Sequence, residues 1–428
     1  MTKYQDLSID ELRTLHDDLE QEYRGWRAKD LELNMARGKP SAAQLELSLP
    51  ILDVLNSKSN LTASDGTDCR NYGVLLGLPE ARALLGAMVG ARPEQVIVGG
   101  ASSLNLMYDT IARAWTHGIA GCEPWGRQEK VKFLCPSPGY DRHFGICEHF
   151  GIEMIPIEMS DEGPDMFTVK KLVQGDPAVK GIWCVPQYSN PQGYTYSDGT
   201  VRAFAALKPA APDFRVFWDN AYVVHHLYGP NKRDHVLNIL DECEKAGNPD
   251  LVFEFCSTSK VTFPGAGIAA LVTSEANVAR IAKAMSVQTI GFDKLNQLRH
   301  VRFLKDARGI EEHMAKHAEL LRPKFELVER IFEEDLGETG IGTWTKPRGG
   351  YFISYVGMEG TAKQTVQMAA NAGVKLTGAG ATWPLHQDPH DADIRIAPSL
   401  PPLEELEQAA RVFTLCARIV TIEKLLLS

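Results

Sequence analysis

The 428-residue chain lacks the features that mark several large protein classes. No stretch approaches the roughly 18 consecutive apolar residues of a membrane span. The N-terminal sequence MTKYQDLSIDELRTLHDDLE is acidic and contains no apolar core of a signal peptide. Lysine and arginine number 45 against 55 acidic residues, and the formal charge of −10 argues against nucleic acid or an anionic membrane as the main partner. We therefore expect a cytoplasmic protein with neither as its partner.

Cysteine is present, but not in a pattern that holds metal ions. The eight cysteines are scattered, with no CxxC pair and no His/Cys cluster at zinc spacing. Buried free thiols in a reducing cytoplasm are the simplest interpretation. No metal site is predicted.

The middle of the chain has the texture of an α/β domain. From about residue 95, short apolar runs alternate with helical segments, which is typical of βαβ units and a largely parallel sheet. The sequence therefore predicts a mostly parallel seven-stranded sheet. The seven runs are Val96–Val98, Val131–Cys135, Glu153–Ile157, Ile182–Val185, Val216–Trp218, Leu251–Phe255 and Ile268–Val272.

The two ends of the chain predict a second, smaller α+β domain. A long helical pattern covers 310–333, and the strand-like pieces GYFISY, VKLTG and DIRIAPS precede a closing helix from about 402. A single hydrophobic core stops growing at about 250–300 residues, so a chain of this length needs two. We place the large domain at 65–300 and form the small domain from 1–64 and 301–428.

Ligands of an open α/β sheet bind beyond the carboxyl ends of its strands. GGASS after the first run sets glycines and hydroxyls before a helix, an arrangement that favours anion binding. Each residue singled out after a run also has a simpler interpretation, as a turn, a helix cap or packing. The residues concerned are Gly100, Ala101 and Ser102, then Tyr140, Asn190, Asp219 and Lys260.

Lys260 is the most informative of these residues, because lysine is among the costliest side chains to bury. It follows an apolar run within STSKVTFPGAG, between small hydroxyl residues and a glycine-rich turn. A phosphate cradle, an aromatic face, an amide, a buried carboxylate and a lysine in one crevice suit pyridoxal 5'-phosphate (PLP). The lysine forms the Schiff base, and the carboxylate keeps the pyridine nitrogen protonated.

The order of these motifs resembles that of the class I/II aminotransferases of PLP fold type I, over nearly the whole chain. SNPQG, DNAY, STSK and RIAPS are similar to four motifs of that family. Within it, ARGKPS, DGTDCRNYG, PGYDRHF and DKLNQLRH resemble the aspartate aminotransferase subgroup called type Ic. The resemblance implies a homodimer with shared active sites.

The resemblance also implies roles for the matching residues. Lys260, Asp219 and Tyr222 would be catalytic, with Lys260 carrying PLP and moving a proton at the substrate. Cofactor contacts would come from Gly100, Ala101, Ser102, Tyr140, Asn190, Asp219, Tyr222, Ser257 and Lys260, and from Tyr72 of the partner subunit. Substrate contacts would come from Arg395, which would clamp the α-carboxylate bidentately, and from Gly38, Asn190 and Arg37.

Two departures from the family pattern leave residues unassigned. KVTFPGAGIAAL contains no arginine after the lysine, where relatives place one that grips the phosphate. Lys294 is our first candidate for a substitute cation, with a solvated lysine as the alternative. The residue that reads a side-chain carboxylate is also open, and Arg37 and Arg142 are the two candidates.

These observations predict a PLP-dependent aminotransferase that moves the amino group of an acidic amino acid, L-aspartate first, to 2-oxoglutarate by a ping-pong mechanism. A transaminase for 2-aminoadipate or aromatic amino acids, or a PLP-dependent β-lyase, would use the same scaffold. A non-enzymatic effector sensor of a transcription regulator is a third alternative. It would need a basic DNA-binding module, and only one acidic helical stretch precedes ARGKP.

Overall fold

The computed structural model describes residues 3–427, and among them eight strands form one large sheet. Its order is β2-β9-β8-β7-β6-β3-β4-β5. β4, β3, β6, β7 and β8 run parallel, whereas β9 is antiparallel to both its neighbours. The strands are β2 (Val96–Val98), β3 (Lys132–Ser137), β4 (Glu153–Ser160), β5 (Gly163–Pro164), β6 (Val179–Cys184), β7 (Arg215–Asp219), β8 (Val252–Ser257) and β9 (Ala269–Val272).

The predicted mostly parallel α/β sheet is confirmed, and each of the seven apolar runs overlaps one of its strands. The predicted strand count of seven is wrong by one. β5 adds an eighth strand, antiparallel to the end of β4 at the edge of the sheet. It consists of Gly163 and Pro164 alone, so it is too short to produce an apolar run in the sequence.

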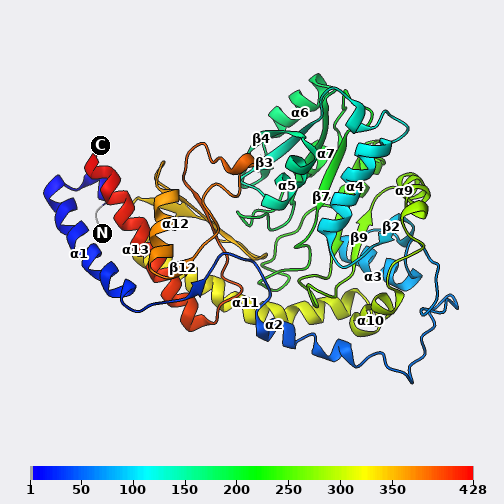
Figure 1. Ribbon diagram of the computed structural model, residues 1–428, viewed down its shortest axis with the longest axis horizontal. Coiled ribbons are helices and arrows are strands. Elements are labelled where there is room, and N and C mark those ends of the chain that lie inside the picture. Colours follow the sequence, from blue (N-terminus) through cyan, green and yellow to red (C-terminus); the bar gives the residue numbers. More distant parts are fainter. Residues whose placement is uncertain (1–2, 428) are drawn as a thin grey trace.

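Alternate side chains of each central strand enter different cores, because successive residues of a strand point to opposite faces. Val216 and Trp218 join a core with α3, α7 and α8, whereas Phe217 and Phe255 join a core with α4 and α5. Figure 1 shows helices on both sides of the sheet. These helices are α3 (Pro79–Val89), α4 (Ser103–His117), α5 (Asp141–Phe150), α6 (Met166–Gly175), α7 (Asp198–Ala205), α8 (Ile239–Lys245), α9 (Glu275–Gln288) and α10 (Lys294–Leu304).

A separate core gathers residues from both ends of the chain. There α1 packs on α13, and the two helices lie side by side in Figure 1. β10, β11 and β13 form an antiparallel sheet, and β1 pairs with β12. The elements are α1 (Ile9–Arg27), β1 (Leu33–Asn34), α2 (Ala42–Glu46), α11 (Ala307–Leu336), β10 (Gly342–Trp344), β11 (Ile353–Gly357), α12 (Ala362–Asn371), β12 (Val374–Lys375), β13 (Asp393–Ile396) and α13 (Leu403–Leu427).

The long helix α11 connects the two parts of the molecule, as Figure 1 shows. Ile310 and Met314, near its start, belong to the core of the large sheet. Leu321 and Phe325, further along, belong to the core formed by the chain ends. Across residues 3–427, no helix has both the length and the apolar content needed to cross a bilayer.

Candidate active site

The predicted site residues collect where the central parallel strands end. Asp219 is the last residue of β7 and Ser257 the last of β8, and Lys260 follows three residues later. Asp219 and Ser257 have the same parity as Phe217 and Phe255, so they lie on the face of the sheet that α4 and α5 cover.

Asp219 is buried, with only 3% of its surface exposed. Its Oδ2 lies 3.0 Å from Nε2 of His143, whose ring stacks on Trp183 at 4.4 Å between centroids. Its Oδ1 is buried and has no hydrogen-bond partner. A buried carboxylate oxygen without a donor is costly, so this atom is available for a donor that the chain does not supply.

His143 was missed by the sequence analysis, which singled out Tyr140 and Arg142 in PGYDRHF. Both residues lie at the start of α5, and their rings are in edge contact at 5.0 Å. The helical spacing of three residues was the available signal, because it places two side chains on the same helix face.

Lys260 lies among tyrosines. Its Nζ is 4.9 Å from the ring centroid of Tyr222 and 5.9 Å from that of Tyr351. Burial raises the pKa of Tyr140 to about 12, and the Lys260 ammonium opposes this rise. Burial also raises the pKa of Tyr222, and the Asp219 carboxylate adds to the effect. Both phenols therefore keep their protons at neutral pH and can donate hydrogen bonds.

Small hydroxyl residues connect the end of β8 to the turn after β2. Ser257 Oγ donates to Ser259 Oγ at 3.1 Å, and Ser259 Oγ donates to the carbonyl of Ala101 at 3.0 Å. The carbonyl of Gly100 accepts from a β9 amide. Ser102 caps the N-terminus of α4 without a side-chain capping bond. Ser259 was also missed; its hydroxyl, on the residue immediately before the lysine, was the signal.

Arg395 reaches this cluster from β13 of the other core, and only 8% of it is exposed. Its Nη1 donates to Asp141 Oδ1 and to Asn190 Oδ1, both at 3.2 Å, and its Nη2 donates to Thr377 Oγ1 at 3.3 Å. Its Nε is buried and unpartnered. One edge of the guanidinium therefore has donor capacity left for a carboxylate.

Gly38 belongs to the same neighbourhood through Phe352. A Cβ at position 38 would lie 2.5 Å from the Phe352 ring, so any larger residue would displace that ring. The ring centroid of Phe352 is in turn 4.8 Å from the guanidinium carbon of Arg395. The absence of a side chain at Gly38 thus keeps Phe352 against the arginine.

Four predicted residues do not join the cluster within one chain. Tyr72 is 82% exposed, and Arg37 and Arg142 are exposed as well. Lys294 is buried, but the contact it makes is with the carbonyl of Gly73, at 3.1 Å. Lys294 therefore anchors the segment that presents Tyr72.

The comparisons with known proteins agree on one family. The family model for aspartate amino-transferase matches residues 7–427. An aspartate aminotransferase of Corynebacterium glutamicum is 43% identical over 420 residues, covering 98% of this chain and 96% of that protein. The crystal structure of an aspartate transaminase from C. glutamicum superposes with a TM-score of 0.95 at 43% identity, covering 99% of both chains.

A more distant structure shows the shared fold. The alpha-aminoadipate aminotransferase of Thermus thermophilus, solved with N-(5'-phosphopyridoxyl)-L-leucine, gives a TM-score of 0.72 at 18% identity over 92% of this chain and 93% of that one. With the family model and the C. glutamicum relative, it agrees with the fold that the resemblance implied. The chain belongs to the aspartate aminotransferase family and is a PLP-dependent aminotransferase of fold type I.

Proposed function

We propose that this enzyme transfers the amino group of an acidic amino acid, with L-aspartate as the first candidate, to 2-oxoglutarate by a ping-pong mechanism. The observation that carries the proposal is the buried Arg395. It donates to Asn190 beside the residues at the strand ends, and its Nε has no hydrogen-bond partner. A guanidinium with a free edge binds a carboxylate bidentately. The acidic substrate is supported by the name of the C. glutamicum relative.

The residues of the cluster fit the family's cofactor. The unpartnered Oδ1 of Asp219 matches the N–H of a protonated pyridine ring. We assign the ring face to Tyr140 and the ring oxygen to Tyr222 and Asn190. When bound, PLP supplies the electron sink that stabilises negative charge at the substrate's α-carbon.

The phosphate group fits the hydroxyl cluster and the start of α4. We assign it to Gly100, Ala101, Ser102, Ser257 and Ser259. The N-terminus of the 15-residue α4 offers free N–H groups and the positive end of the helix dipole, both of which favour a phosphate. The arginine that relatives use there is missing from the sequence, so hydroxyls and amides carry more of the binding.

We assign Lys260 two tasks, which are to hold PLP covalently and to move a proton at the substrate's α-carbon. The buried rings of Tyr222 and Tyr351 lie beside its amine, and a lysine amine is the group that forms a Schiff base with PLP. His143 holds Asp219 in place for the ring nitrogen.

We further propose a cytoplasmic homodimer with shared active sites. The exposure of Tyr72 and its anchoring through Lys294 and Gly73 support a contact with the phosphate of the partner subunit. The three hydrophobic cores support a large domain over 65–300 and a small one over 1–64 and 301–428, with α11 shared between them. The eight free cysteines support the cytoplasm.

The half-reaction tests the proposal. Addition of L-aspartate to the yellow PLP form, without any 2-oxo acid, is expected to bleach the cofactor band and release one oxaloacetate per active site. Added 2-oxoglutarate should then restore the band. A yellow enzyme that L-aspartate leaves unchanged, but that another amino acid bleaches, would contradict the substrate assignment.

The residue that reads the side-chain carboxylate is tested with a matched pair of variants. Arg37→Leu and Arg142→Leu each remove one exposed guanidinium. The variant that lacks the reader should lose turnover of aspartate but not of alanine, whereas the other should keep the wild-type ratio. An unchanged ratio in both variants would remove both candidates.

A further inference from the structure

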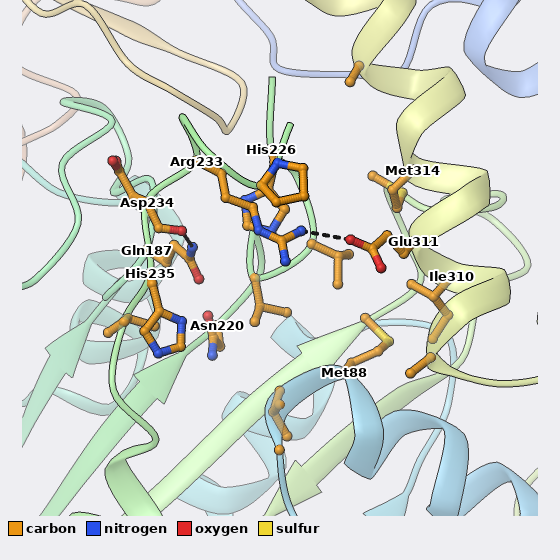
Figure 2. A pocket seen from close by; sticks show the side chains of 18 of the residues that line it. Met88, Gln187, Asn220, His226, Arg233, Asp234, His235, Ile310, Glu311 and Met314 are labelled. Atoms are coloured by element: carbon orange, nitrogen blue, oxygen red, sulfur yellow. Dashed lines mark hydrogen bonds and ion pairs between the residues drawn. The ribbon is translucent and has the colours of Figure 1, made fainter. Parts of the chain in front are cut away.

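A cavity of about 560 Å³ lies on the face of the large sheet opposite Asp219 and Ser257. It is bounded by α3, by Trp218 of β7 and Glu254 of β8, by the segment 223–239 and by the first half of α11. Figure 2 shows Ile310 and Met314 projecting into it from α11, with Met88 of α3 below. Its volume falls within the roughly 300–1,000 Å³ that is usual for small-molecule sites.

Strand parity separates this cavity from the proposed active site. Glu254 of β8 pairs in register with Trp218 of β7, and Trp218 belongs to the core on the α3 side. Asp219 and Ser257 have the other parity and face α4 and α5. A ligand in the cavity would therefore contact the back of the same two strands without entering the Lys260 cluster.

Two buried polar atoms on the wall of this cavity have no partner. Asn220 Nδ2 donates to Glu254 Oε1 at 2.9 Å, but Asn220 Oδ1 and Glu254 Oε2 make no hydrogen bond. The two residues are only 4% and 2% exposed. Unsatisfied polar atoms are rare in protein interiors, and a pair of them on the wall of a cavity calls for an explanation.

Two other polar side chains that line the cavity, Arg233 and His226, already have partners. Arg233 donates to Glu311 at 2.9 Å, as the dashed line in Figure 2 shows. His226 Nδ1 lies 2.7 Å from the Tyr188 hydroxyl. Most of the remaining wall is apolar, including Met88, Trp218, Val224, Leu237, Ile310 and Met314. Among the described residues that line the cavity, the buried side-chain atoms without a hydrogen-bond partner belong to Asn220 and Glu254.

We propose that this cavity binds a small neutral molecule with an apolar, ring-sized body and a carboxamide-like group, whose N–H donates to Asn220 Oδ1 and whose carbonyl accepts from the Glu254 carboxyl. Asn220 Oδ1 is an acceptor only, so the ligand must bring a donor. Burial raises the pKa of Glu254 to about 8, so at neutral pH this carboxyl holds a proton that it can donate. A neutral ligand also avoids the cost of burying a charge.

The probe is 4-fluorobenzamide, followed by fluorine NMR on the PLP-loaded enzyme. An amide does not condense with PLP, so the probe should leave the cofactor absorbance unchanged. We expect a Kd of about 1 mM or below, as is usual for a well-placed fragment of this size. Methyl 4-fluorobenzoate, which has no N–H, and the cationic 4-fluorobenzamidine should both bind at least about tenfold more weakly, a difference of about 1.4 kcal/mol.

Two variants of α11 locate the site. Ala318→Trp places an indole in the cavity from a half-buried position, and should weaken the probe at least about tenfold. Lys316→Trp is the matched control, because Lys316 is exposed on the same helix and does not line the cavity. It should leave the Kd unchanged. Equal weakening by both variants would place the probe elsewhere and overturn the proposal.

Two variants of Glu254 test the chemistry. Glu254→Gln keeps an acceptor for Asn220 and a donor for the ligand, so it should bind the probe about as well as wild type. Glu254→Leu removes both and should lose binding. Loss of binding in Glu254→Gln, tighter binding of the benzamidine, or equal binding of the ester would each overturn the proposal.

Discussion

The buried acid Glu254 makes a sharp prediction about stability. It lies in β8 with 2% of its surface exposed, and burial raises its pKa from 4.5 to about 8. The folded protein therefore retains a proton between these two values that the unfolded chain has lost. Because the folded state binds more protons in this window, the free energy of unfolding falls as pH rises from about 4.5 to 8.

The size of the effect follows from the two pKa values. Each unit of separation between the two pKa values corresponds to about 1.36 kcal/mol. The free energy of unfolding is therefore about 5 kcal/mol lower at alkaline pH. Glu254→Gln cannot ionise and removes this loss. The unfolding entropy is about 2.1 cal/mol/K per residue over 428 residues. With this entropy, the part of the stability loss that falls between about pH 5.5 and pH 8.5 lowers the Tm by about 4 °C.

Thermal melts of the PLP-loaded wild type and Glu254→Gln, each at both pH values, measure this difference. The advantage of the variant should grow by several degrees toward alkaline pH. Glu312→Gln, an exposed substitution on α11, should show no such growth. An equal Tm difference at the two pH values would refute the idea that a protonated acid is buried at this position.

Three further predictions concern the proposed active site. Arg395→Lys loses the planar donor fork and should lower kcat/KM for L-aspartate by about 10–100-fold, because a hydrogen bond to a charged group contributes roughly 1.5–3 kcal/mol. Steady-state kinetics measure this change, and an unchanged kcat/KM would contradict the prediction. His143→Phe keeps an aromatic ring against Trp183 but leaves Asp219 without its donor, so PLP should bind about tenfold more weakly in an absorbance titration. Ser259→Ala removes the hydroxyl that links Ser257 to Ala101, and should weaken PLP several-fold while leaving the Tm of the apoenzyme within a few degrees of wild type.

The main sheet was predictable because its strands are buried on both faces. Each central strand is a nearly unbroken apolar run, and such runs can be recognised without knowing what covers them. β5 escaped because two residues carry no periodicity. The same argument could have found Glu254. A charged residue inside a strand that is apolar on both faces must itself be buried. Glu254 was counted only as a member of the apolar run Leu251–Phe255.

The candidate site was predictable residue by residue, but its pairings were not. Asp219, Tyr222 and Lys260 each lie at or shortly after the end of a strand and could be named from the sequence. The hydrogen bond from His143 to Asp219 spans 76 positions, and that from Arg395 to Asn190 spans 205. The first contact depends on how β3, β6 and β7 lie side by side, and the second on how β13 of the other sheet packs near the end of β6. The local pattern encodes neither.

The account rests on Lys260 as the residue that carries PLP. Borohydride reduction of the yellow enzyme fixes the cofactor to the lysine that holds it, and peptide mass mapping then identifies that lysine. The account predicts a single pyridoxyl-modified peptide that contains Lys260. Modification of another lysine, such as Lys294, or an enzyme that takes up no PLP, would contradict it.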